Sequence, residues 1–325
     1  MKRNIYINTQ GGLGFCCALA SICPELKAAF NKVCICSPYY DLYESSPYVD
    51  YVYKPHEMRD FIFDAKRDDA KLICERMYDS EDFIYKKVSY ADAWRKACGL
   101  KVHNNKEGSD IKSVLNPLEA YPALQQTVGQ VMQAVAGAKD FVIMQFEGGQ
   151  SPLVDVPRGA DGKADWSRVP TNYDNEPLKR HYPYNLAQRF IDLFRQAHPD
   201  TAILLYQLPN EHKYEGTLSF EIPYLAYYLL AQTDKCRGTV SIDSSLQHLV
   251  AGVTKSLVVW GHSLPDSFGY EYNMNIVQEC HRDDILYFSA LGPSGARISY
   301  IKPEDLLKEV NEYLYDDELK AAEEA

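Results

Sequence analysis

The sequence predicts an α/β protein made of two Rossmann-like domains, each built on a parallel sheet. The chain has 325 residues, a length that suits two domains at about 150 residues each. Short apolar runs alternate with segments of helical spacing, and this order is typical of βαβ units and parallel sheets. After a polar, Pro-containing segment at 103–125, the pattern restarts near residue 140, which indicates a second unit of the same kind.

The first half begins with a strand that runs into a glycine turn. Asn4–Asn8 is a short apolar strand, and Gln10–Gly14 follows it directly. Phe15–Phe30 has the apolar spacing of a helix, with a break or an end expected near Pro24. Further strands are expected at 32–37, 48–53 and 82–85, and a helix at 126–138.

The second half repeats the alternation and ends in a helix with an acidic tail. Strands are expected at 141–145, 202–206, 238–242 and 256–260, and helices at 185–197, 223–231, 244–253 and 303–324. We therefore expect an N-terminal domain at 1–139, a C-terminal domain at 140–302, and a C-terminal helix with its tail at 303–325.

Composition and charge exclude several classes of protein. Hydrophobic residues make up 46% and charged residues 24%, as in ordinary soluble domains, and no apolar run approaches the ~18–20 residues of a membrane span. The N-terminus has no apolar run of signal-peptide length, so we expect a cytoplasmic protein. The net charge is −11, of which −7 lies from residue 304 onward, and this argues against bulk nucleic-acid affinity. The chain has nine cysteines without paired CxxC units, and most of them are expected to be buried thiols in a reducing compartment.

The glycine turn is the first motif that carries chemistry. Gly11, Gly12 and Gly14 allow the backbone to pass close to a ligand, and the helix that follows offers unpaired N–H groups to an anion. The spacing lacks both GxGxxG and the Walker lysine, which counts against a dinucleotide oxidoreductase or a P-loop NTPase. Tight strand–helix turns also use glycine for packing alone.

The second motif is SIDSSLQH at 241–248, which ends one predicted strand and begins a helix. Asp243, Ser244 and Ser245 suit an N-cap, and their hydroxyls with the free N–H groups make a site for a phosphate. His248 falls one turn further on. The alternative is a plain helix cap with a histidine satisfied inside the protein.

The third motif is a basic pair before the helix expected at 185–197. Lys179 and Arg180 place two cations beside a helix start, where they could neutralise a diphosphate. The alternative is a solvated basic corner.

Together these motifs resemble glycosyltransferase family nine, the heptosyltransferases of lipopolysaccharide assembly. The resemblance runs in matching order over residues 1–60 and 140–275, with SIDSSLQHLVAGVTKSLVVWGHSLPDSFGY at 241–270 as its most specific part. It also includes GGLG at 11–14, LKRHYP at 178–183 and LLYQLPNE at 204–211. The resemblance implies the GT-B architecture of two facing Rossmann-like domains, and a transferase that uses a nucleotide-sugar.

The resemblance also implies which residues bind the nucleotide-sugar donor. They are Gly12, Gly14, Lys179, Arg180, Glu211, Asp243, Ser244, Ser245 and His248. The 241–248 motif would hold the diphosphate with Asp243 at the sugar side, and Glu211 would accept hydrogen bonds from the ribose. Lys179 or Arg180 would stabilise the departing nucleoside diphosphate, the work that a metal does in other transferases. We therefore expect no metal and no cofactor besides this co-substrate.

The catalytic base is where this chain departs from the family. The family usually has Asp directly after GGLG, whereas this chain has Phe15. A carboxylate from another loop at the strand ends of the N-terminal domain must then act. We expect it to be Asp41, which follows the second strand in a short aromatic loop, ahead of Glu44, Glu57 and Asp92. The alternative is that Asp41 only caps that turn.

Several functional readings stay open. The expected reaction is inverting and metal-independent transfer to a hydroxyl, either of a surface glycan such as lipopolysaccharide or of a hydroxymethylated DNA base, because viral DNA glucosyltransferases also use two facing Rossmann-like domains. The alternative is a non-catalytic nucleotide-sugar binding protein in which Phe15 marks a lost base. A cysteine-based enzyme has only Cys16 and Cys17 at a helix start in its favour. A weak homo-oligomer is compatible with all three.

Overall fold

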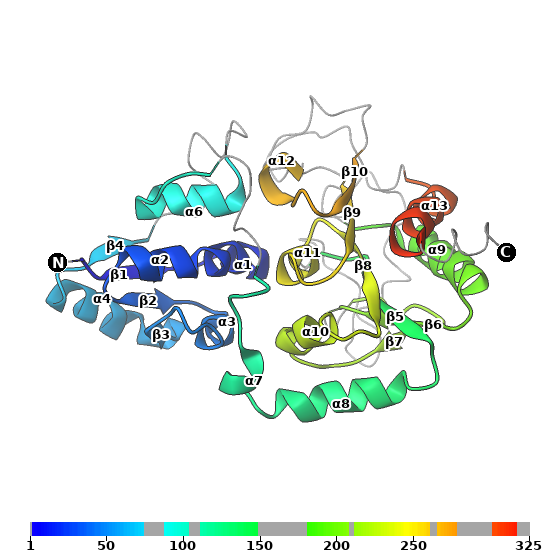
Figure 1. Ribbon diagram of the computed structural model, residues 1–325, viewed down its shortest axis with the longest axis horizontal. Helices are drawn as coiled ribbons and strands as arrows, with labels where there is room; N and C mark the ends of the chain where they lie inside the picture. The colour runs from blue at the N-terminus through cyan, green and yellow to red at the C-terminus, as the bar shows by residue number, and fades with distance from the viewer. Residues whose placement is uncertain are drawn as a thin grey trace, which may run out of the picture.

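A computed structural model shows two parallel sheets with helices packed against them (Figure 1). It describes residues 2–74, 88–103, 111–148, 181–207, 211–260, 265–277 and 301–316. The strand orders are β3-β2-β1-β4 and β10-β9-β8-β5-β6-β7, and every strand pair among these residues is parallel. The predicted α/β class with two parallel sheets is confirmed.

The first sheet and its helices come from the N-terminal part of the chain. The strands are β1 (Ile5–Asn8), β2 (Val33–Cys36), β3 (Tyr51–Tyr53) and β4 (Lys71–Ile73). The helices are α1 (Leu13–Ser21), α2 (Cys23–Ala29), α3 (Tyr40–Glu44), η1 (Pro55–Glu57), α4 (Met58–Arg67) and α6 (Tyr90–Cys98). The helix expected over 15–30 is divided at Ile22, and this confirms the break expected near Pro24, which lies in the first turn of α2 and has no N–H to continue α1. The strand expected at 82–85 lies outside the described residues.

The second sheet begins at residue 140, as the repeated pattern predicted. Its strands are β5 (Asp140–Gln145), β6 (Thr201–Leu205), β7 (Leu218–Ser219), β8 (Cys236–Ile242), β9 (Ser256–Trp260) and β10 (Met274–Val277). Two helices precede β5, namely α7 (Pro117–Ala120) and α8 (Leu124–Ala134). The helices that follow β5 are α9 (Tyr184–Ala197), α10 (Tyr224–Leu230), α11 (Ser245–Leu249), α12 (Pro265–Phe268) and α13 (Pro303–Leu314). The helix expected over 244–253 ends at Leu249.

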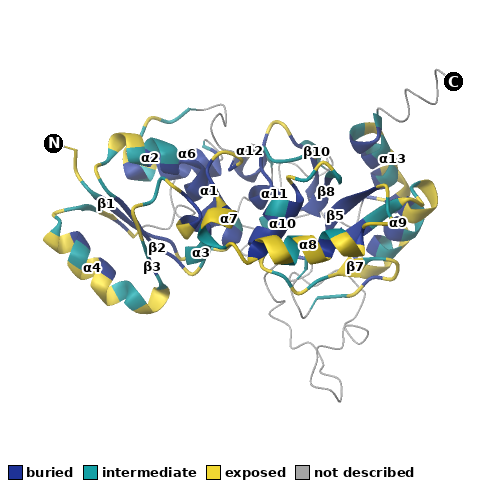
Figure 2. Ribbon diagram, turned by 60° about the horizontal axis from the view of Figure 1, so that its bottom comes forward, coloured by how far each residue is buried: buried dark blue, intermediate teal, exposed yellow. Residues whose placement is uncertain are grey.

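Helices cover both faces of the second sheet. In Figure 1, α10 and α11 lie between this sheet and the first one, and α9 and α13 pack together on the opposite side. All six residues of β5 are buried, as expected for a central parallel strand. Figure 2 shows exposed residues on the outer sides of α4 and α8.

The two domains meet where α1 packs against α11 (Figure 1). α1 follows the glycine turn, and α11 contains the end of the 241–248 motif. The fold therefore brings together two motifs that are more than 200 residues apart in the chain. Among the described helices, none is both long and apolar enough to cross a membrane.

Candidate functional site

Gly14 and His248 are in direct contact across the domain interface. A Cβ atom added at Gly14 would lie 2.4 Å from Cδ2 of His248, a separation that steric repulsion forbids. The absence of a side chain at Gly14 is therefore what allows α1 and α11 to approach. A Cβ added at Gly12 would meet no atom within 4 Å, so the start of α1 is open at that residue.

His248 is held on its other sides by tyrosines from both domains. It is 3% exposed, and its Nδ1 lies 2.9 Å from the hydroxyl of Tyr270. The ring of Tyr90, the first residue of α6, lies 5.6 Å from the imidazole. The sequence predicted His248 one turn into the helix, and the structure places it in the contact between the domains.

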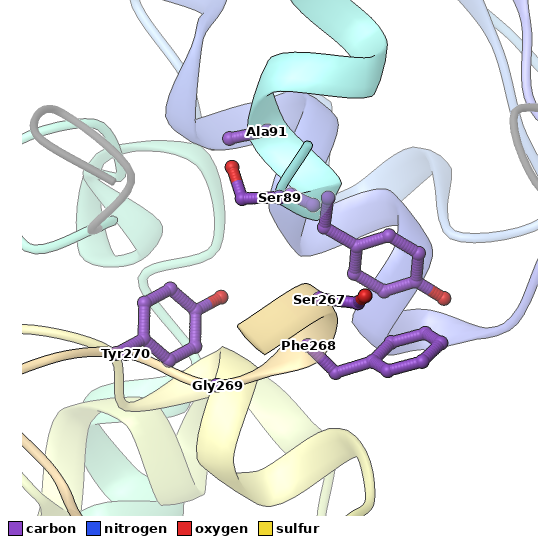
Figure 3. A pocket seen from close by; sticks show the side chains of 8 residues that line it. Ser89, Ala91, Ser267, Phe268, Gly269 and Tyr270 are labelled. Carbon is purple, nitrogen blue, oxygen red and sulfur yellow. The ribbon is translucent and has the colours of Figure 1, made fainter. Parts of the chain in front are cut away.

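A small pocket lies between the start of α6 and α12, and two of its lining residues, Tyr90 and Tyr270, also contact His248. Figure 3 shows Ser89 and Ala91 on one side of it and Ser267, Phe268, Gly269 and Tyr270 on the other. Its lining residues are Ala18, Ser89, Tyr90, Ala91, Ser267, Phe268, Gly269 and Tyr270. The pocket is thus formed by both domains.

Gln145, the last residue of β5, holds the start of α11. Its Nε2 donates to Ser244 Oγ at 3.1 Å, and its Oε1 accepts the N–H of Leu246 at 3.2 Å. Ser244 occupies the N-cap position as predicted, but its own side chain makes no capping hydrogen bond. The cap comes instead from a residue 99 positions earlier. Because Ser244 Oγ accepts from Gln145, its own proton remains able to donate to a ligand.

The other polar residues of the 241–248 motif also have partners within the protein. Asp243 is buried and accepts from Gln247 Nε2 at 2.8 Å. Ser245 Oγ donates to the hydroxyl of Tyr206 at 3.3 Å. These bonds place the motif at the C-terminal end of β8, the sheet edge at which open α/β sheets bind ligands.

Asp41 is half-buried at the same domain interface. It belongs to α3 of the N-terminal domain and faces α10 of the C-terminal domain. The hydroxyl of Tyr224, the first residue of α10, donates to Asp41 Oδ1, and the N–H of Leu42 donates to the same oxygen at 3.1 Å. Burial raises the pKa of the Asp41 carboxyl above its usual value, and the two hydrogen bonds act against this shift. Asp41 thus contacts the C-terminal domain through Tyr224.

The three other carboxylates considered as bases have structural partners. Asp92 is 1% exposed and pairs with Arg95 at 3.0 Å. Glu57 accepts the N–H of Lys54 at 2.7 Å and so begins η1. Glu44 accepts from the hydroxyl of Tyr121.

Phe15 fills the position of the family's base with an apolar ring. It is 4% exposed, and its ring centroid lies 4.7 Å from Trp94 and 5.9 Å from Tyr90. Its carbonyl accepts the indole N–H of Trp94 at 3.2 Å. Phe15 therefore packs α1 onto α6 and has no group that can take a proton.

Glu211 belongs to the described part of the chain, and the next residue, His212, is partly buried and pairs with the buried Glu147. Nδ1 of His212 lies 2.7 Å from Oε1 of Glu147, two residues beyond the end of β5. The hydroxyl of Tyr214 donates to the same oxygen at 3.1 Å. This pair was not predicted from the sequence, although Glu147 directly after the buried strand β5 was a signal for it. Lys179 and Arg180 lie outside the described residues.

Most of the described cysteines are buried thiols, as the sequence predicted, whereas Cys74 is exposed and Cys236 is partly buried. Cys16 and Cys17 are both fully enclosed, and burial raises the pKa of each thiol above its usual value. A position near the start of α1 therefore does not activate them, and a cysteine-based enzyme has no support.

Within the described ranges, no three His, Cys, Asp or Glu side chains are grouped to hold a metal ion. Metal independence stays a prediction.

Two facing Rossmann-like domains, with a glycine turn of one against a strand–helix motif of the other, define the GT-B class of fold. No family model matches this chain, and no curated protein matches its sequence. Among solved structures, the chain is similar to a family 9 glycosyl transferase from Veillonella parvula DSM 2008, with 10% identity, 97% of each chain covered and a TM-score of 0.63.

Two Escherichia coli structures show the same similarity. ADP-heptose lps heptosyltransferase II is 13% identical over 97% of this chain and 99% of its own, with a TM-score of 0.58. Heptosyltransferase WaaC with ADP is 10% identical over 95% of this chain and 99% of its own, with a TM-score of 0.55. At these identities the similarity shows the fold, and the resemblance to family nine is confirmed at that level.

Proposed function

We propose that this protein is a glycosyltransferase that moves a sugar from a nucleoside diphosphate sugar to an acceptor hydroxyl. The observation that carries the proposal is the contact between Gly14 and His248, which joins the glycine turn and the 241–248 motif in one interface. The similar structures are named as glycosyltransferases, one of them for ADP-heptose and another with ADP. A nucleotide-sugar donor is the ligand class that agrees with both facts.

The donor diphosphate would bind at the start of α11. Ser244 has a hydroxyl proton to donate, because Gln145 already supplies the bond that its oxygen accepts. Ser245 and the imidazole of His248 lie on the same short helix. Hydroxyls and backbone N–H groups at a helix start favour an anion. Lys179 or Arg180 would stabilise the leaving diphosphate, and Glu211 would bind the ribose.

Asp41 would act as the base that takes the proton of the acceptor hydroxyl. Its raised pKa makes it a better proton acceptor than an exposed Asp, and the hydroxyl of Tyr224 fixes its carboxylate at the domain interface. The deprotonated hydroxyl would attack the anomeric carbon as the nucleoside diphosphate leaves from the opposite face, so the anomeric configuration inverts. The reaction would need no metal, because hydroxyls, helix N–H groups and the basic pair receive the diphosphate charge.

The acceptor would be a hydroxyl of a surface glycan such as lipopolysaccharide, or of a hydroxymethylated DNA base. The second candidate function is a nucleotide-sugar binding protein without catalysis. The buried ring of Phe15 at the family's base position favours it.

The test is a binding and turnover experiment on the full chain. Calorimetry with nucleoside diphosphates and nucleotide-sugars should detect binding, and release of the nucleoside diphosphate should rise when acceptors of either class are added. The release should persist in the presence of a chelator. Binding of none of these ligands would refute the proposal, and tight binding without release for any acceptor would favour the binding protein.

A further inference from the structure

Glu147 is a buried carboxylate whose hydrogen-bond partners among the described residues all contact one of its two oxygens. It is 5% exposed, and its Oε1 accepts the backbone N–H of His212 at 3.3 Å, Nδ1–H of the same residue at 2.7 Å and the hydroxyl of Tyr214 at 3.1 Å. Its Oε2 is buried without a hydrogen-bond partner in the described part of the chain. A buried carboxylate oxygen left unpaired costs free energy, so a missing donor is indicated.

Aromatic rings connect this carboxylate to the molecular surface. Tyr184, the first residue of α9, is 40% exposed. Its ring stacks on Tyr214 at 5.2 Å with 24° between the planes, and lies 4.6 Å from the imidazole of His212. Exposed aromatic faces of this kind bind planar ligands by stacking. The cluster thus combines a stacking surface with an acceptor.

The cluster lies at the same sheet edge as the proposed diphosphate site. β5 lies between β8 and β6, and Glu147 follows β5 as Ser244 follows β8. Gln145, two residues before Glu147, is hydrogen-bonded to Ser244. The Glu147 cluster and the start of α11 therefore lie beside each other along this edge, so one nucleoside diphosphate can span both.

We propose that Glu147, together with Tyr184 and His212, binds the base of the nucleoside diphosphate donor and selects bases that carry an amino group. This inference rests on the proposed function. An ionised carboxylate only accepts hydrogen bonds. Adenine, guanine and cytosine offer an exocyclic NH₂ group, whereas uracil and thymine place carbonyl oxygens on both sides of their single N–H group.

The neighbours of Glu147 leave Oε2 for the ligand. Burial and the adjacent carboxylate raise the pKa of the Tyr214 hydroxyl well above its usual value, so that hydroxyl stays protonated and donates. Its bond and the two bonds from His212 all go to Oε1. The base would stack on Tyr184 and donate its amino hydrogen to Oε2.

The experiment measures the affinity of the full chain for ADP, GDP, CDP, UDP and thymidine diphosphate by calorimetry. The three diphosphates with amino-bearing bases should bind about tenfold or more tightly than the other two, as for one charge-assisted hydrogen bond. In Glu147→Gln the amide oxygen can keep the bonds of Oε1, while its NH₂ group replaces Oε2 and donates. The preference should then disappear or reverse.

Two further variants separate the effect of the carboxylate from a general loss of fold. Glu215→Gln changes an exposed acid in the same segment and should leave the preference intact. Tyr184→Ala should weaken all five diphosphates by similar factors, and Tyr184→Phe should keep their affinities. These Tyr184 variants remain informative if Glu147→Gln does not fold.

The outcomes distinguish this inference from the proposed function. If wild-type protein binds none of the five diphosphates, the proposed function itself fails. If it binds all five equally, or if Glu147→Gln keeps the wild-type preference, the inference is overturned and a buried water is the partner of Oε2. Unchanged binding in Tyr184→Ala would equally remove the stacking surface from the site.

Discussion

The two sides of the domain interface differ in chemistry. On the N-terminal side, Phe15 packs against Trp94 and Tyr90, and the base expected from the family is replaced by an apolar ring. On the C-terminal side, Gln145 and Ser244 belong to a hydrogen-bonded group at the ends of β5 and β8. The difference teaches that the half proposed to bind the donor keeps a polar frame, whereas the half that would face the acceptor depends on one carboxylate, Asp41.

The largest expected effect is the loss of turnover in Asp41→Asn, which tests whether catalysis depends on this carboxylate. Asp41→Asn keeps the shape of the side chain and can still accept from Tyr224, but it loses basicity. We expect turnover to fall by about 10²–10⁴, the usual contribution of a positioned general base, while calorimetric affinity for the donor stays unchanged.

The pH profile is the control for Asp41. Because burial raises its pKa above the usual value of 3.8, wild-type activity should be lost as the pH falls through that raised value, and the variant should lack this acidic limb. An Asp41→Asn protein with near-normal turnover would show that the N-terminal side holds a different base, or that the acceptor needs none.

Substitution of His248 tests whether the C-terminal side of the interface binds the donor. His248→Ala removes the imidazole from the helix whose start is the proposed diphosphate site, and we expect nucleoside diphosphate affinity to fall about tenfold or more, as for loss of one hydrogen bond to a charged group. Calorimetry on the folded variant measures this. Equal affinity in wild type and variant would mean that His248 serves only the packing of α11 on α1.

Gly14 tests whether the two sides must touch. Gly14→Ala would drive its methyl group into His248, and we expect the free energy of unfolding to fall by about 1–3 kcal/mol, the usual cost of overpacking. Gly12→Ala is the matched control, because a Cβ there meets no atom within 4 Å. Adding His248→Ala to Gly14→Ala should recover part of the loss in a denaturant titration. No recovery would contradict this contact as the cause.

How far the sequence could predict the molecule depends on the range of each interaction. The alternation of strands and helices is local, so the parallel sheets and their order along the chain could be predicted. β4, β7 and β10 were missed, whereas β1 and β2, which are also short, were predicted, because β1 and β2 are apolar runs buried throughout and the missed strands are only partly buried or exposed. The edge strand β7 has both of its residues exposed, so it lacks even an apolar signal.

Contacts between distant segments could not be predicted in the same way. The sequence indicated that Ser244 starts a helix, but not that Gln145 supplies the cap. Gly14 was identified as a turn residue, whereas its contact with His248 depends on how two domains pack. The pair of Glu147 and His212 joins the segments that follow β5 and β6. These segments are neighbours only because β5 and β6 are adjacent in the sheet.

The smallest expected effect concerns that long-range cap. In Gln145→Glu the carboxylate can still accept the N–H of Leu246, but it can no longer donate to Ser244. Ser244 would then turn its own proton toward residue 145, and this proton would be lost to the donor phosphate. We expect the Michaelis constant for the donor to rise severalfold, about the contribution of one hydrogen bond, with little change in kcat. Gln125→Glu on the exposed side of α8 adds the same charge away from the interface and should change neither constant. If both variants behave like wild type, the bond between Gln145 and Ser244 only stabilises the fold, and the polar side of the interface has no dedicated support for the donor.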